Sequence, residues 1–140
     1  MKRVSIAAFI FSGTFAIAQA PAVSMKQLML DLIHPASNDL LLLINRGSPQ
    51  DEREWAVVRR SALTLAESGN LLMTPGRARD QGDWMKDARS LADVGSAAYK
   101  AAQAKDGKAL AALAAPLDAS CTTCHQHYRP NVFPREGASR

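Results

Sequence analysis

The sequence predicts an all-α protein that folds as an antiparallel four-helix bundle. Four segments place apolar residues three and four positions apart, which is the spacing of one helix face. The connections between these segments are short, and no stretch alternates apolar and polar residues as a half-buried strand does. The 140 residues are enough for one domain with a buried core.

Residues 1–18 have the organisation of a secretory signal peptide. A basic start is followed by an apolar run that is short for a membrane span and ends in small residues. Residues 18–20 and 16–18 both have the A-x-A form, but a cut after residue 20 would leave Pro21 beside the cleaved bond. We expect cleavage between residues 18 and 22, with Gln19 as the preferred mature start. The alternative is an uncleaved membrane anchor, whereas cleavage implies periplasmic export without stable membrane insertion.

The first helix is predicted from about residue 22 to residue 46, with Gly47 as its stop. Pro35 lies inside it, so the helix either kinks there or is replaced by two shorter helices, with Ser37 and Asn38 capping the restart. The predicted buried stripe consists of Met25, Met29, Leu32, Ala36, Leu40 and Leu43.

The run Leu40 to Ile44 is apolar on all sides, which is more than one buried stripe requires. Two interpretations stay open. The surplus either mediates a homodimer through the first helix or is buried under a loop between later helices.

The second helix is predicted to begin near Ser48, Pro49 and Asp51 and to run to about Ser68, where Gly69 and the next residue end it. The third is predicted over residues 83–105. Their core stripes are Trp55, Val58, Ala62 and Leu65, and then Trp84, Ala88, Leu91, Gly95, Ala98 and Ala102. The small residues of the third helix would allow close approach by a neighbouring helix or a flat ligand.

The fourth helix is predicted over residues 107–129, with a kink caused by Pro116 and an end at Pro130. Residues 130–140 are predicted to form an extended tail, so the bundle spans residues 19–129. The core stripe of the fourth helix contains two cysteines and reads Leu110, Leu113, Leu117, Cys121, Cys124 and Tyr128.

The fourth helix carries CxxCH, formed by Cys121, Cys124 and His125, which is the attachment sequence of a c-type haem. Residues three and four apart share a helix face, so both thiols and the imidazole point to one side. The thiols can bond to the haem vinyl groups and the imidazole can ligate the iron. We therefore expect one covalent haem c.

Two other uses of this motif fit the sequence less well. A structural zinc site needs four ligands, but the chain has only these two cysteines and no paired histidines. A thioredoxin-like redox pair needs a βαβ context, and no strand pattern precedes the motif. The loop arginines Arg77 and Arg79 could bind haem propionates or a partner, although solvated loop charge is the favoured interpretation.

The charge balance does not point to nucleic acid. The formal net charge of +4 includes two cations of the leader, and no basic cluster is interleaved with aromatic residues. Both cysteines belong to the haem motif, which agrees with a periplasmic protein that has no structural disulfide.

The run from Cys121 to Arg129, CxxCHxxYR near the end of a helical chain, resembles the cytochrome c prime family, the class II c-type cytochromes, in particular its low-spin, methionine-ligated branch. This resemblance implies a four-helix bundle with the haem near one end and a distal residue from the first helix. Met29 matches that position best, and Met25 is the close alternative, although many family members carry Arg there. Arg129 corresponds to a basic residue beside the proximal ligand, and Tyr128 is expected to pack against the haem edge.

The predicted function is one-electron transfer to redox partner proteins, with His125 and Met29 as iron ligands and no enzymatic activity. The alternative is a five-coordinate protein that binds nitric oxide or carbon monoxide. A peroxidase is disfavoured because no distal acid–base residue is evident. Weaker candidates for the sixth ligand are Met73, Met85, His34 and His127, the last of which is expected to face solvent.

Overall fold

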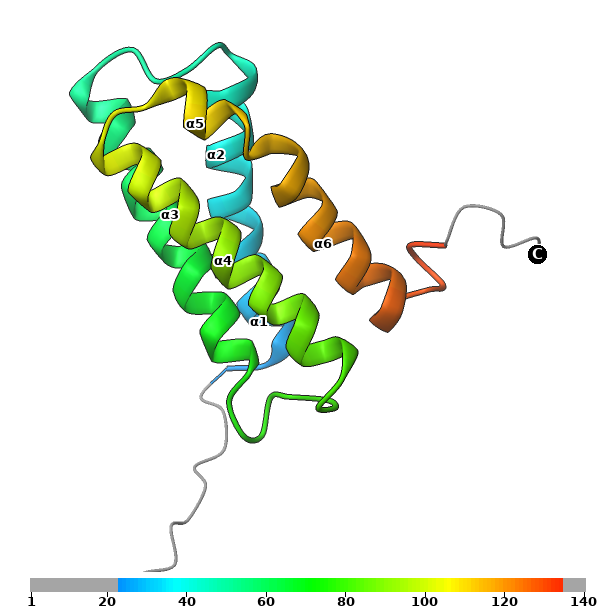
Figure 1. Ribbon diagram of the computed structural model, residues 1–140. Helices are drawn as coiled ribbons and strands as arrows, with labels where there is room; N and C mark the ends of the chain where they lie inside the picture. The colour runs from blue at the N-terminus through cyan, green and yellow to red at the C-terminus, as the bar shows by residue number, and fades with distance from the viewer. Residues whose placement is uncertain (1–22, 135–140) are drawn as a thin grey trace, which may run out of the picture.

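The computed structural model describes residues 23–134, which form helices and loops and contain no strand (Figure 1). The all-α prediction is confirmed for this part of the chain, and the arrangement is that of a helical bundle. The helices are α1 (Met25–Leu28), the π-helical turn η1 (Met29–Ile33), α2 (His34–Asn45), α3 (Glu52–Leu72), α4 (Asp83–Gln103), α5 (Gly107–Ala111) and α6 (Ala114–Tyr128).

Four helical rods make up this bundle. We call the continuous run α1–η1–α2 the first rod, and α5 and α6 together form the last one. The predicted leader lies outside the described residues, as do positions 135–140 of the predicted tail. Within residues 23–134, no helix is both long and apolar enough to cross a membrane.

The first rod stays helical through Pro35 because the chain widens just before it. In η1 the backbone N–H of His34 donates to the carbonyl of Met29, five residues back instead of four. A proline in a regular helix lacks its N–H and clashes with the preceding turn, and a wider turn relieves that clash. The predicted restart is therefore wrong: Ser37 lies inside α2, and its hydroxyl donates to the carbonyl of His34.

The wide turn shifts the buried face by one residue. Leu28 and Ile33 are both buried although they are five positions apart, and the regular spacing resumes at Ala36. Leu32, predicted to be in the core, is 43% exposed. That prediction was wrong because it assumed 3.6 residues per turn throughout.

The apolar run Leu40 to Ile44 is mostly accounted for by burial inside the chain. Leu40 and Leu43 belong to the core, and Leu41 and Ile44 are half-buried against it. Only Leu42 is well exposed, at 61%. Homodimerisation through this segment stays a prediction, and Leu42 is the residue of this run that an opposing chain would reach.

The turn between α2 and α3 differs from the prediction at its second half. Gly47, with a φ of +100°, ends the first rod as predicted. Ser48 does not cap α3. The cap is Asp51, whose carboxylate accepts the backbone N–H of Glu54 at 2.8 Å.

Gly69 does not end the second predicted helix, since α3 continues to Leu72. A β-carbon at Gly69 would lie 2.6 Å from the backbone nitrogen of Ala92, and one at Gly95 would lie 2.4 Å from that of Ala66. Both glycines therefore serve close contact between α3 and α4. The small residues of α4 were predicted to allow close approach by a neighbouring helix or by a flat ligand, and the structure shows close approach by the helix α3.

The core stripes predicted for α3 and α4 are confirmed, since all ten positions are buried. Each large apolar side chain buried in this way contributes about 1.5–3 kcal/mol to the free energy of folding. Trp84 also satisfies its indole N–H, which donates to the carbonyl of Leu72 at 2.7 Å.

The last predicted helix is broken where a kink was expected. Residues 112 and 113 form a turn between α5 and α6, four and three positions before Pro116. Proline provides no N–H for the carbonyl of Ala112 and its ring crowds that group, so the helix separates at this point. The break lets α6 take its own direction beside α4 (Figure 1).

The glycine contacts predict an unusual response to alanine. Gly95→Ala should destabilise the protein by about 1–3 kcal/mol, because the new methyl group must push α3 and α4 apart. An ordinary helix would instead gain about 1 kcal/mol from this change. Urea denaturation measures the difference, with Ser96→Ala at the adjacent exposed position as the control. A stabilised Gly95→Ala variant would contradict the packing.

Candidate functional site

An open cavity of about 540 Å³ lies between the first rod and α6. Its volume is within the range of about 300–1,000 Å³ that is usual for ligand and cofactor sites. The residues of the CxxCH motif line one side of it, and apolar residues of the first rod line the other. The lining includes Met25, Met29, Ile33, His34, Leu41, Arg79, Trp84, Cys121, Cys124, His125, Tyr128, Arg129 and Phe133.

All six predicted site residues line this cavity. The weaker candidates for the sixth iron ligand, in contrast, do not all lie at the cavity. Met73 and Met85 do not line the cavity, whereas His34 does. His34 is exposed, however, and lies at the junction between η1 and α2.

Met29 lies deeper than Met25. A second hollow of about 40 Å³ lies beneath the cavity, and Met29 lines it together with Cys121, Cys124 and His125. Met25 lines only the outer cavity. Of the two methionines, only Met29 therefore shares a hollow with the thiols and the imidazole of the CxxCH motif.

The side chain of Phe133 packs against the imidazole of His125. The two rings stack with centroids 4.7 Å apart and an angle of 30° between their planes. A turn after α6 makes this contact, because the backbone N–H of Phe133 donates to the carbonyl of Arg129 at 2.9 Å. The beginning of the predicted extended tail is thus folded back toward the site. Nothing in the local pattern of the sequence indicates this contact.

His125 is favoured in its neutral form, which is the form that binds a metal. Burial lowers the pKa of the imidazole, and the nearby positive charge of Arg129 lowers it further. Arg129 was predicted to lie beside this ligand, and its guanidinium is also 5.8 Å from the centre of the Phe133 ring.

The two thiols are free and half-buried. Burial raises the pKa of Cys121, and burial together with the charge of Asp87 raises the pKa of Cys124 to about 11. A redox-active thiol needs a lowered pKa, so this environment does not favour thioredoxin-like exchange. Within residues 23–134, no three or more His, Cys, Asp or Glu side chains gather where they could hold a metal ion.

His127 was predicted to face solvent, but in the structure its ring contacts another helix. Its Nδ1 lies 2.7 Å from Oδ2 of Asp87, a residue of α4 that is only 5% exposed. The contact attaches α6 to α4, and Asp87 itself lines the 40 Å³ hollow together with Cys124 and His125. Asp87 was missed by sequence reasoning, although an acidic residue three positions after Trp84 and four before Leu91 on a core face is a signal for a buried polar partner.

Tyr128 contacts Trp84 and the loop between α3 and α4. Its ring meets Trp84 edge-on, with centroids 4.9 Å apart, and its hydroxyl donates to the carboxylate of Asp80. The same carboxylate accepts the backbone N–H groups of Gly82 and Trp84. Arg79 lies over both aromatic rings, 5.8 Å from Trp84 and 5.9 Å from Tyr128.

This network changes the acidity of both partners. Burial and the hydrogen bond to Asp80 raise the pKa of the Tyr128 hydroxyl. The hydrogen bonds from Tyr128 and from Trp84 lower the pKa of Asp80. The neutral tyrosine and the ionised aspartate are therefore the favoured forms.

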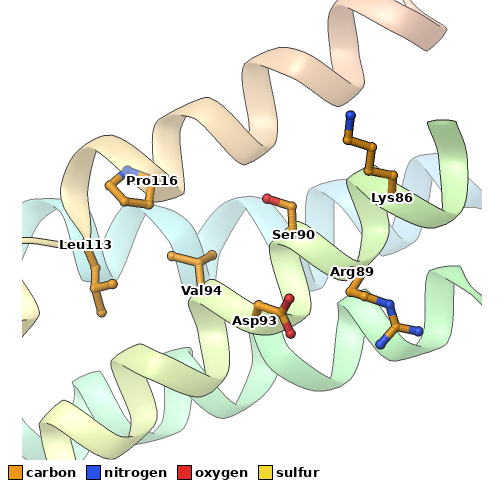
Figure 2. Close-up of a pocket in the computed structure, with 7 residues that line it drawn as sticks. All are labelled: Lys86, Arg89, Ser90, Asp93, Val94, Leu113 and Pro116. Atoms are coloured by element: carbon orange, nitrogen blue, oxygen red, sulfur yellow. The ribbon is translucent and has the colours of Figure 1, made fainter.

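A second groove, of about 430 Å³, lies between α4 and the start of α6 (Figure 2). Its lining consists of Lys86, Arg89, Ser90, Asp93, Val94, Leu113 and Pro116. No sulfur atom or imidazole ring lines this groove, whereas the side chains of the CxxCH motif line the first cavity.

Comparisons of the chain with protein-family models, with curated proteins and with solved structures found no match.

The Tyr128 network predicts a specific pH dependence. Because the pKa of the hydroxyl is raised above its usual value of about 10, its stabilising effect is complete below about pH 10 and is lost as the pH rises through the folded-state value. Tyr128→Phe should lower stability at neutral pH and flatten the decrease above pH 10. Urea midpoints across pH measure this, with Tyr99→Phe as the control. Parallel pH profiles for wild type and Tyr128→Phe would contradict it.

Proposed function

We propose that the protein is a mono-haem c-type cytochrome that carries one electron at a time. The observation that supports this function best is the cavity itself. It has Cys121, Cys124 and His125 on one wall and the thioethers of Met25 and Met29 on the other. Thiols, imidazole and thioether are the donor set of a covalently attached, six-coordinate haem.

In this proposal each residue has a separate role. Cys121 and Cys124 would form the thioether bonds that attach the haem to α6, and neutral His125 would ligate its iron. Met29, on the first rod, would supply the second ligand, and Trp84 and Ile33 would exclude water from the cavity. When bound, the haem supplies an iron that alternates between ferric and ferrous states.

The proposed fold is an antiparallel bundle with the haem near one end, as the resemblance to the low-spin branch of the cytochrome c prime family implies. The contacts of α3 with α4 support this direction. Gly69 of α3 lies against Ala92 of α4. Three residues earlier in α3, Ala66 lies against Gly95, which is three residues later in α4, so the two helices run in opposite directions. Tyr128, at the end of α6, contacts the loop that joins those two helices.

The proposed location is the periplasm, where haem is attached covalently to exported chains, and the proposed partners are redox proteins. Gas binding is the second candidate function. The apolar side chains of Leu30, Ile33 and Leu41 on the cavity wall support it, since an apolar distal pocket without an iron ligand suits nitric oxide or carbon monoxide.

Covalent attachment is tested by intact mass. The periplasmic protein should exceed its mature polypeptide by the mass of one haem, with the leader removed between residues 18 and 22. The absorbance should remain with the polypeptide after acid–acetone extraction. Replacing Cys121 and Cys124 together by Ser should abolish both signals. Polypeptide mass alone for the wild type would overturn the haem assignment.

The iron ligand from the first rod is tested by two matched substitutions. Met29→Leu should keep the covalent haem but convert a low-spin spectrum into a high-spin one in nearly all molecules, and it should lower the reduction potential. Met25→Leu should change the spectrum little, because Met25 lies about 6 Å along the helix and outside the inner hollow.

The other outcomes discriminate between the functions. A wild type that is already high-spin, and that Met29→Leu scarcely changes, would favour gas binding. Loss of the low-spin spectrum in Met25→Leu alone would leave electron transfer in place and assign the ligand one turn earlier.

A further inference from the structure

Arg77 is a buried cation in the connection between α3 and α4, residues 73–82. It is only 8% exposed, although solvated charge was the favoured prediction for this loop. Its guanidinium Nη2 donates to the backbone carbonyl of Val23 at 3.2 Å, a contact that joins positions 54 residues apart. Burying a guanidinium is costly, so a buried arginine with a specific acceptor requires an explanation beyond solubility.

The connection holds Arg77 in a defined position relative to α3. The backbone N–H groups of Arg77 and Ala78 both donate to the carbonyl of Thr74 at 3.1 Å, and the Thr74 hydroxyl donates to the carbonyl of Leu71 at 2.7 Å. Gly76 provides the positive φ of +86° that the turn requires. Arg77 is thus attached to the α3–α4 pair by short-range contacts.

The acceptor, Val23, directly precedes Ser24, which is the N-cap of the first rod. Ser24 and Gln27 form a reciprocal capping box, so the helix begins at a fixed residue. From there α1 leads without interruption into η1, which begins with Met29. A contact that fixes the carbonyl of Val23 therefore limits sliding and rotation of the helix that carries Met29.

The same connection also holds the opposite wall of the cavity. Asp80, three residues after Arg77, accepts the hydroxyl of Tyr128, which lies one turn beyond His125 on α6. One short loop therefore contacts the helix of each proposed iron ligand, through Arg77 on one side and Asp80 on the other.

We propose that Arg77 is a positioning residue for the iron site. By holding the start of the first rod, it keeps Met29 within reach of the iron bound by His125, and this role rests on the His125–Met29 ligation proposed above. Arg77 touches neither ligand, so it affects the spin state of the iron only through the position of the helix.

The test compares holoproteins in which residue 77 is changed. Arg77→Met keeps an unbranched side chain but removes the donors. It should retain covalent haem, while the low-spin fraction falls and becomes temperature-dependent. Amide hydrogen exchange over residues 28–33 should become about tenfold faster or more. Arg77→Lys keeps one cationic donor and should restore part of both signals. Arg89→Met, at an exposed site on α4, is the control and should change neither.

A purely structural role gives a different result. Replacing a buried cation by an apolar side chain can be neutral or stabilising, so Arg77→Met would then keep the wild-type spectrum and exchange rates, and that result would overturn the proposal. If circular dichroism shows that Arg77→Met is unfolded, Arg77→Lys decides, because wild-type exchange at residues 28–33 in that variant would also overturn it. A high-spin wild type would contradict iron ligation by Met29, but the exchange rates would still test whether Arg77 holds the first rod. Failure of the proposed function can therefore be distinguished from failure of the role proposed for Arg77.

Discussion

The backbones of α3 and α4 approach so closely at Gly69 and Gly95 that neither position has room for a β-carbon. This contact makes the two longest helices one regular unit, against which the other two rods pack: α2 lies on α3, and α6 lies on α4 (Figure 1). The first rod and α6 have few contacts with each other, because the cavity occupies the space between their ends. The position of each wall therefore depends on how its helix is attached to the α3–α4 unit.

Each of the two rods beside the cavity contains a proline, and the chain accommodates the two prolines differently. Pro35 is preceded by the wide turn η1, so the first rod stays continuous, whereas Pro116 follows the break between α5 and α6. No proline lies within α3 or α4, which remain regular. The irregular backbone is thus confined to the two rods that carry the proposed ligands, while regular helices provide the packing surface.

The sequence was sufficient where structure depends on local periodicity or on a compact motif. The core faces of α3 and α4 follow the 3.6-residue repeat, and CxxCH gathers three site residues on one helix turn regardless of the tertiary fold. It was insufficient where a contact joins distant residues. The pairs Asp87–His127 and Arg77–Val23 are 40 and 54 positions apart, and neither has a spacing rule. The glycine at position 69 was misread because a helix stop and a close helix contact require the same residue.

The wide turn η1 holds one residue more than a regular helix turn would. One residue corresponds to a rotation of about 100° around a helix axis. Leu28 and Ile33 are both buried although they are five positions apart, so deleting one residue between Met29 and Ile33 would leave them four apart, which is the spacing of one face of a regular helix. The wide turn therefore accommodates one extra residue while the core residues on its two sides stay in register, and a chain one residue shorter here could keep the same buried face as a regular helix.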